Sequence, residues 1–306
     1  MINVLTKKHF LILFFGSLYG SLAAQSYLGF NVDNDLYFGS DRYYSSGIFL
    51  EYGFHRKVKS DSTNKKHFIS KHWTLGQEIN TPSLHKTIDK KDMDYPYSGW
   101  LFLRFSKERY KNSDFGFGWG VTFGVSGAEA SLAKKMQNTY HILVLNLEEL
   151  SWSFSIPQAF HINAQTSFSS GIIIRQNIKF VQQSHLEFGT FRIGAKTKFG
   201  LQLGNLQGLP FFGYRLEKIM RGSAVFLGTV LEYKYHDYSL TGSLFKDNSP
   251  FDFEMKRFTN NLQAGIMIHQ NPWRLKLLFN SMSKNISEQE YKRHPFLNIT
   301  LSRVFK

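Results

Sequence analysis

The chain has 306 residues, of which 42% are hydrophobic, 20% charged and 16% aromatic, and its mean hydropathy is −0.28. Beyond the first two dozen residues no stretch approaches the ~18 to 20 consecutive apolar residues of a spanning helix, which excludes a bundle of transmembrane helices. The aromatic content argues against disorder, the lack of cysteine excludes disulfides and thiolate chemistry, and the net charge of +14 suggests an anionic partner such as nucleic acid, a membrane surface or a phosphorylated lipid.

The N-terminus has the features of a secretory signal peptide. Two lysines precede the apolar run Phe10–Tyr19, and small residues follow, with cleavage expected after Ala23 or Ala24. A single membrane anchor is the alternative reading, but the run is about half the length that such a span requires. We therefore expect residues 1–24 to be a signal peptide and residues 25–306 to form one domain. Export lowers the charge to +12 and argues against a nucleic-acid partner.

Alternation with the period of a β-strand dominates the mature chain. In Phe115–Val125 every odd position is large and apolar, and every even position is glycine or threonine. In Phe191–Gly204 apolar residues alternate mainly with arginine, lysine and glutamine. A soluble sandwich could also alternate, but its strands usually have ~5 to 6 residues, whereas ~9 to 11 tilted residues cross a bilayer. These runs have 11 and 14 residues, which favours membrane-spanning strands.

Similar runs fill most of the remaining chain: Ser45–His55, Phe68–Thr81, Ser98–Ser106, Phe160–Ile172, Ile178–Phe188, Ser223–Tyr235, Tyr238–Lys246, Phe258–His269, Trp273–Met282 and Pro295–Phe305. The raw count is twelve or thirteen, and bacterial outer-membrane barrels close with an even number. Short connections, as at His236-Asp237 and Asn271-Pro272, contrast with long polar ones such as residues 56–66. We expect an all-β transmembrane antiparallel barrel of about twelve strands, monomeric, in the outer membrane of a bacterium.

One segment departs from the strand period. Between Gly127 and Leu147, apolar residues recur at helical spacing, which predicts a short amphipathic helix after the fifth strand. On this helix Gln137 and His141 are four residues apart and share one face. The helix therefore presents a polar pair at the end of the barrel where it lies.

Strand parity places several polar groups at one end of the barrel. If the first strand runs outward from the periplasm, every connection after an odd-numbered strand is extracellular. Asp33-Asn34-Asp35 ends the first strand, Ser45 begins the second, Gln77-Glu78 ends the third, and His141 follows the fifth. We expect these groups at the outer rim, where chemistry on a lipid of the outer leaflet would take place.

Each of these groups has an ordinary structural interpretation as well. Asp33-Asn34-Asp35 is more often a hydrogen-bonded turn than a metal site, and Ser45 can be an ordinary hydroxyl at the start of a strand. A histidine on an amphipathic helix is usually a surface group, although Gln137 one turn before His141 gives it weight. The sequence contains neither a G-x-S-x-G nucleophile elbow nor H-E-x-x-H. A serine triad is therefore not the natural interpretation.

Five short motifs together resemble those of a known family. In chain order they are Asp33-Asn34-Asp35, Asp41-Arg42-Tyr43-Tyr44-Ser45-Ser46-Gly47, Tyr95-Pro96-Tyr97-Ser98-Gly99-Trp100, Gly124-Val125-Ser126-Gly127 and Gln137-Asn138-Thr139-Tyr140-His141. Their order and spacing are similar to those of the lipid A 3′-O-deacylase family of outer-membrane barrels. The resemblance implies a twelve-stranded barrel that removes the 3′-acyloxyacyl group of lipid A with calcium and a catalytic histidine. It places Asn34, Asp35, Ser45, Gln137 and His141 at active-site positions.

The chain departs from the family pattern after the helix. Where the family has an acidic residue six positions beyond the histidine, this chain has Leu147, followed by Glu148 and Glu149. A G-W-D-N-Q-like run of the family is replaced here by a serine-rich segment with Ser153 at its centre. Either glutamate could serve after a small shift in register, or the site has an altered substrate or has lost its activity.

The residue types suit ester hydrolysis by activated water. His141 can act as a general base, because an imidazole near its unperturbed pKa of ~6.5 accepts and releases protons at neutral pH. Gln137 and Ser45 would orient the water or the substrate. We expect Glu148 to be the acidic partner that fixes the tautomer of His141.

The same rim offers oxygen ligands for a hard cation. The carboxylate of Asp35 and the amide oxygen of Asn34 suit calcium, which binds carboxylate and carbonyl oxygens. As a Lewis acid, Ca²⁺ would polarise the ester carbonyl and stabilise the oxyanion. We therefore expect a calcium-assisted hydrolase.

The positive charge fits a phosphorylated substrate such as lipid A or lipopolysaccharide. Arg42, Arg56 and Lys57 could contact its phosphates at the outer rim, although solvated loops explain these charges equally well. Two other functions stay open: a non-enzymatic pore or structural barrel, and an outer-membrane phospholipase whose nucleophile would be Ser45 or Ser126.

Overall fold

The computed structural model describes residues 25–58, 67–84, 86–112, 114–206, 208–212, 221–246 and 249–305. The expected signal peptide, residues 1–24, lies outside the described residues. Among the helices in the described part, none is long and apolar enough to cross a membrane.

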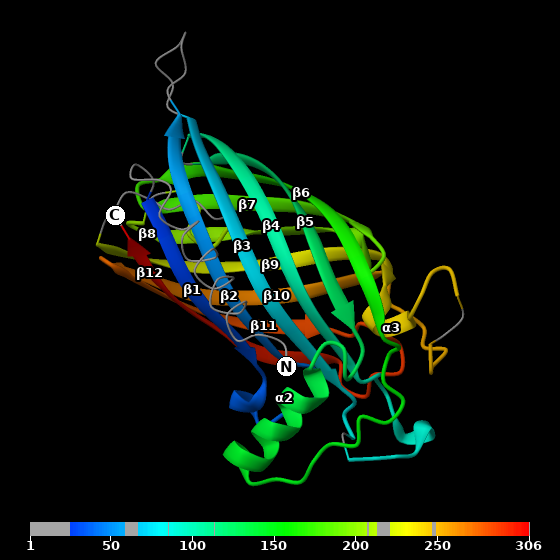
Figure 1. The fold of residues 1–306 in the computed structure, drawn as a ribbon. Coiled ribbons are helices and arrows are strands. Elements are labelled where there is room, and N and C mark those ends of the chain that lie inside the picture. The colour runs from blue at the N-terminus through cyan, green and yellow to red at the C-terminus, as the bar shows by residue number, and fades with distance from the viewer. Residues whose placement is uncertain are drawn as a thin grey trace, which may run out of the picture.

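The described residues form a closed antiparallel barrel of twelve strands (Figure 1). Each strand pairs with its neighbours in the sequence, and β1 closes the barrel against β12. The strands are β1 Gln25–Asn34, β2 Tyr43–Val58, β3 His67–Thr81, β4 Ser98–Asn112, β5 Phe115–Ser126, β6 Ala159–Arg175, β7 Ile178–Gly189, β8 Arg192–Gly204, β9 Gly222–Asp237, β10 Phe258–Gln270, β11 Trp273–Ser283 and β12 Arg293–Phe305. The strand number, the antiparallel pairing and the closure that the sequence predicted are confirmed.

The alternation in the sequence arises from the two environments of each strand. In β5 the large odd-numbered side chains such as Phe117 and Phe123 are exposed on the outer face, and the glycines face the lumen. A Cβ at Gly124 would lie 2.5 Å from the ring of Trp100, so glycine leaves the space that this ring fills. An apolar outer face is what a bilayer requires of a membrane-spanning barrel.

Short helices and most of the long connections lie at one end of the barrel, which we call the site end. The helix α2, Ala133–Tyr140, continues into a π-helical turn, His141–Leu145, and both follow β5 as predicted. A single helical turn, α3 (Tyr238–Thr241), lies at the same end (Figure 1). Two 3₁₀ turns, Leu36–Phe38 and Lys90–Asp92, complete the set of described helices.

One boundary predicted from the sequence is wrong. His236-Asp237 was expected to be a turn between two strands, but β9 extends to Asp237, and the expected strand Tyr238–Lys246 does not form. The Asp237 carboxylate accepts a hydrogen bond from the Ser239 backbone N–H at 3.1 Å and caps the helical turn α3. Tyr238 and Leu240 alternate because both are buried at the site end, not because they lie in a strand.

The connection between β8 and β9 enters the lumen from the end opposite to the site end. Its described residues, which include Leu209, Phe211 and Phe212, pack with Phe226 and Met267 on the inner wall. We call residues 208–212 the plug segment. Because apolar side chains of this segment occupy part of the lumen, the barrel interior does not resemble the open, polar channel of a porin.

Candidate functional site

An aspartate joins the helix to the first connection of the barrel. The Asp41 carboxylate accepts a hydrogen bond from Nε2 of His141 at 2.8 Å and one from Nε2 of Gln137 at 3.3 Å. All three side chains are largely buried. The side chains of Gln137 and His141, which their spacing predicted to share one face of the helix, therefore face the wall of the barrel and meet a carboxylate there.

The helix can approach the wall because strand β4 has a glycine where it crosses. A Cβ on Gly99 would collide with the Ser131 hydroxyl and with the Ala133 Cβ at the start of α2. At the other side, the Asn138 amide exchanges two hydrogen bonds with the backbone of Leu150, at 3.2 and 3.0 Å. The position of His141 is thus set by close packing on one side of the helix and by two hydrogen bonds on the other.

We expect Gly99→Val to lower the ester-hydrolase activity expected from the sequence without unfolding the barrel. The added side chain must displace the start of α2, and a shift of about 1 Å in a catalytic group can cost about 10²-fold in rate. The barrel should retain its heat-modifiable migration on a gel. Gly29→Ala is the matched control, because the added Cβ would meet the Ser302 hydroxyl at 3.1 Å inside the lumen, away from α2. Full activity of Gly99→Val would show that the helix position does not matter.

A buried carboxyl group lies next to this constellation. Asp35 is fully buried, and its Oδ2 accepts hydrogen bonds from the Ser40 hydroxyl at 2.9 Å and the Arg42 backbone N–H at 3.0 Å. Its Oδ1 has no hydrogen-bond partner among the described residues. Burial raises the pKa of Asp35 to about 8 against its ordinary value of 3.8. Nε2 of His294 lies 3.9 Å from Oδ2, but it donates its hydrogen bond to the Tyr44 carbonyl at 2.9 Å.

Several oxygens of the site end could hold a hard cation beside Asp35. Within the described residues, Oγ of Ser45, Oε1 of Gln77 and Oε1 of Gln137 are buried without a hydrogen-bond partner. The Ser45 carbonyl accepts a hydrogen bond from the Asp35 N–H at 3.2 Å, so these two residues adjoin each other. Buried oxygens without donors are what Ca²⁺ satisfies, whereas the described residues hold no group of three or more His, Cys, Asp or Glu with metal-site geometry.

Asn34 has a local structural role in the described conformation. Its side-chain Oδ1 accepts a hydrogen bond from the Leu36 N–H at 2.7 Å. This bond forms the hydrogen-bonded turn that the sequence offered as the alternative to a metal site. This bond does not use the second lone pair of the oxygen. Asn34 therefore positions the turn that carries Asp35, and its role as a ligand stays a prediction.

The expected pairing of Glu148 with His141 is wrong. The Glu148 side chain is 82% exposed and forms an ion pair with Lys86 at 3.0 Å, and Leu147 beside it is also exposed. The chain turns away from the barrel wall after His141, because a π-helical turn follows and Asn146 adopts a left-handed conformation. Asp41 holds the position next to His141 that we had assigned to Glu148. Asp41 is the first residue of the second motif, so the sequence pointed to it, but we had assigned it no role.

Basic residues expected at the rim lie at different ends of the barrel. Arg42 is at the site end, with its guanidinium carbon 3.5 Å from the ring centroid of Tyr291. The backbones of Arg56 and Lys57 pair with Ile69 and Phe68 at the opposite end, because β2 runs away from the site end over its whole length. Their assignment to the same rim as Arg42 is therefore wrong, and their side chains lie outside the described residues.

A serine beside a histidine is found at the site end, but it lacks the third member of a triad. Oγ of Ser126 is 2.9 Å from Nε2 of His161, and Nδ1 of His161 is 3.3 Å from the Thr190 hydroxyl. The Ser126 hydroxyl also donates to the Pro157 carbonyl at 3.1 Å. Both residues are buried, with the Trp100 ring against His161. This arrangement is typical of a packed polar pair, and it offers a substrate no open nucleophile.

The outer side of the π-helical turn that follows α2 is apolar. Leu143 and Val144 are 77% and 62% exposed, and Ile142 and Tyr140 are also exposed. His141, at the centre of this segment, is buried on the opposite side. The turn thus buries His141 against the barrel and presents its apolar side chains outward.

The long strands, the apolar outer face and the closed pairing define an outer-membrane β-barrel protein. Residues 10–305 match the family model described as outer membrane protein LpxR, and the chain belongs to this family. It is an outer-membrane protein.

A solved structure of an LpxR protein has the same fold. The structure of LpxR from Salmonella typhimurium matches 91% of this chain and 100% of its own, with 19% sequence identity and a TM-score of 0.74. The β domain of the Bordetella autotransporter BrkA matches 92% of this chain and 98% of its own, with 9% identity and a TM-score of 0.42. A search of curated protein sequences found no match.

Proposed function

We propose that this protein is an outer-membrane lipid A deacylase that hydrolyses the ester of the 3′-acyloxyacyl group. The observation that carries the proposal is the pair of His141 and Asp41 beside the buried Asp35, in a chain of the LpxR family. Because the polar constellation is at a barrel end and the adjoining π-helical turn has an apolar outer face, the substrate would be a lipid of the adjoining leaflet.

In this mechanism His141 is the general base. Its Nε2–H donates to Asp41, so the proton that it takes from water is accepted at Nδ1. The Asp41 carboxylate holds this tautomer and stabilises the imidazolium that forms, which is the role of the carboxylate in a serine-hydrolase triad. Gln137 donates to the other oxygen of Asp41 and fixes the orientation of the carboxylate. Gln137 is thus a positioning residue.

The donor set at the site end fits calcium. Asp35 with its unpartnered Oδ1 would be the anionic ligand, and Asn34 and Ser45 would supply neutral oxygens. When bound, Ca²⁺ would supply Lewis-acid stabilisation of the negative charge on the ester oxygen. Because burial raises the pKa of Asp35 to about 8, a bound cation would be what keeps its carboxylate ionised in this buried place.

The residues around His141 fit the parts of such a substrate. The apolar outer face at Leu143 and Val144 can lie among acyl chains at the membrane interface. Arg42 can contact a phosphate, because a guanidinium binds phosphate oxygens in pairs.

Mass spectrometry of lipid A from cells that express the chain tests the proposal. Loss of the 3′-acyloxyacyl group is expected in these cells and not in cells with an empty vector. Cells that express His141→Ala serve as a second control, since this variant retains the barrel. Unchanged lipid A from cells and from purified protein with calcium would favour a structural barrel, and release of a phospholipid acyl chain would favour a phospholipase.

Calcium dependence can be tested on purified protein in detergent. We expect chelation or Asp35→Ala to abolish deacylation, because the remaining oxygens of the site are neutral and bind a hard cation weakly. Asn34→Ala should retain the anionic ligand, so excess calcium should restore part of its activity. Equal activity with and without a chelator would contradict a calcium requirement.

A further inference from the structure

Two of the cavities that the described residues line lie inside the barrel, separate from the His141 constellation. One has a volume of about 300 Å³ and reaches the plug segment, and the other has about 380 Å³ and reaches Tyr44 and Tyr95 towards the site end. Both are lined by Gln183, His185, Lys198 and Lys276, so they meet at this level. We call the first the inner chamber and the second the outer chamber. Neither is lined by His141 or Asp35.

Charges in the outer chamber are mostly paired. Arg192 contacts Glu78 at 2.8 Å and Asp237 at 3.3 Å, and Lys234 contacts Glu232 at 3.5 Å. These pairs cancel most of the charge on the way into the lumen. The outer chamber is therefore a nearly neutral, polar passage.

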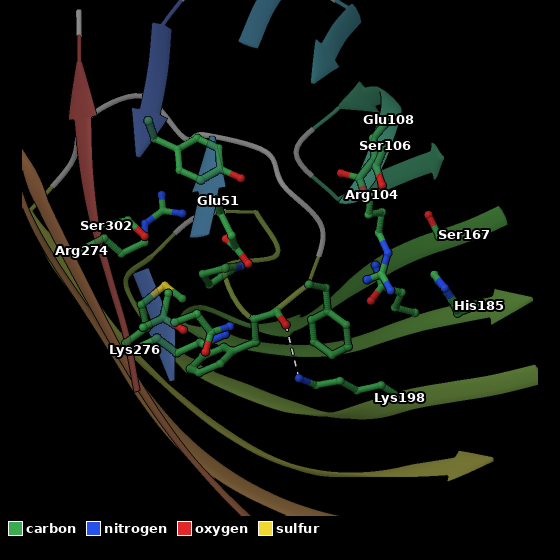
Figure 2. Close-up of a pocket in the computed structure, with 18 of the residues that line it drawn as sticks. Glu51, Arg104, Ser106, Glu108, Ser167, His185, Lys198, Arg274, Lys276 and Ser302 are labelled. Carbon is green, nitrogen blue, oxygen red and sulfur yellow. Dashed lines mark hydrogen bonds between the residues drawn. The ribbon is translucent and has the colours of Figure 1, made fainter. Parts of the chain in front are cut away.

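Charges in the inner chamber are arranged differently. It is lined by four basic residues, Arg104, Lys198, Arg274 and Lys276, and by two acidic residues, Glu51 and Glu108. Among the described residues no carboxylate oxygen lies within 4 Å of a side-chain nitrogen of Arg104, Lys198 or Lys276, and the Glu51 carboxylate acts on Arg104 and Lys276 only from farther away. Figure 2 shows these basic side chains on different sides of the cavity.

The neutral contacts of these three side chains leave donors unused. Nζ of Lys198 donates to the carbonyl of Phe211 in the plug segment at 3.3 Å, the bond drawn in Figure 2. Nε of Arg104 donates to the Thr122 hydroxyl at 3.1 Å, whereas the rest of its guanidinium makes no hydrogen bond to the described residues. Lys276 makes none to the described residues. Several N–H groups therefore remain for a ligand in the chamber.

Cations that leave water need an anion. Moving an ammonium or guanidinium group into a protein interior is costly unless it is paired. The three groups come from β4, β8 and β11, so they surround the chamber instead of forming a stripe on one strand. Ser106 and Ser302 add hydroxyl donors to the same lining.

We propose that the inner chamber binds a small free oxyanion of the phosphate or sulfate class, held by Lys198, Lys276 and Arg104. A tetrahedral oxyanion has acceptors in all directions, which matches donors that converge from three strands. The anion source is the free ion. A lipid phosphate would have to bring its glycolipid into a lumen whose far side is occupied by the plug segment. The site is independent of the proposed deacylase activity.

Equilibrium dialysis of the detergent-purified mature barrel against labelled inorganic phosphate tests the proposal at constant ionic strength. The wild-type protein is expected to bind phosphate saturably. Lys276→Met and Lys198→Met should each weaken binding about 10-fold or more, the usual cost of losing a charge-assisted hydrogen bond. Lys135→Met, which removes the same charge from the exposed side of α2, is the matched control and should bind as the wild type.

Heat-modifiable migration reports whether each variant is folded. If Lys198→Met fails to fold because its contact with the plug segment is lost, Lys276→Met carries the test. The absence of saturable binding in the wild type, or equal affinity in Lys276→Met and Lys135→Met, would overturn the site. Lipid A added in the same detergent should not displace the phosphate, and competitive displacement would overturn its assignment to a free ion.

Discussion

His141→Ala is expected to lower the rate of lipid A deacylation by about 10² to 10⁴-fold, the usual contribution of a general base. The variant removes the proton acceptor. It also removes the hydrogen bond that Asp41 accepts from Nε2 of His141 at 2.8 Å. Single-turnover assays in detergent with calcium, read by mass spectrometry of lipid A, would measure the effect on the chemical step.

Two controls separate chemistry from folding in this experiment. Heat-modifiable migration should be unchanged, because His141 lies beyond the end of β5, outside the strands that pair to form the barrel. Lys135→Ala, at an exposed position of the same helix, should retain wild-type activity. Full deacylation by His141→Ala would refute the proposed base.

The barrel could be predicted from the sequence because its two environments repeat every second residue. The glycines opposite the large side chains of β5 mark where the lumen is filled by residues such as Trp100, and the length of the alternating runs distinguishes a bilayer from a soluble sandwich. The prediction failed at Tyr238 and Leu240, where two buried residues in a helical turn imitate a strand. The plug segment was not predicted, since its apolar residues carry no period that marks them as lying inside the lumen.

The candidate site could be predicted only in part, because its contacts join distant segments. Gln137 and His141 share a face through local helical geometry, which the sequence reveals. The contact of His141 with Asp41 spans 100 residues and depends on how α2 crosses Gly99, which no local pattern encodes. Glu148 was chosen because it is near in sequence, and the backbone after His141 carries it away from the site.

Asp41→Asn is expected to lower deacylation by about 10² to 10⁴-fold with the barrel intact. Asparagine keeps the size of the side chain but removes the charge that stabilises the imidazolium of His141. Its amide can also donate, which favours the wrong tautomer, as in a triad whose aspartate is changed to asparagine. The loss should appear mainly in kcat, because Asp41 acts through His141 and not through the substrate.

Glu148→Gln is the paired experiment, because it makes the same chemical change at the residue that sequence reasoning favoured. Its carboxylate contacts only Lys86 among the described side chains, at an exposed position where an ion pair is worth about 0 to 1 kcal/mol. The variant should therefore deacylate lipid A at the wild-type rate, whereas Asp41→Asn should not. If Glu148→Gln is inactive and Asp41→Asn is active, the carboxylate that serves His141 during the reaction comes from the loop after the helix, and the Asp41 contact is structural.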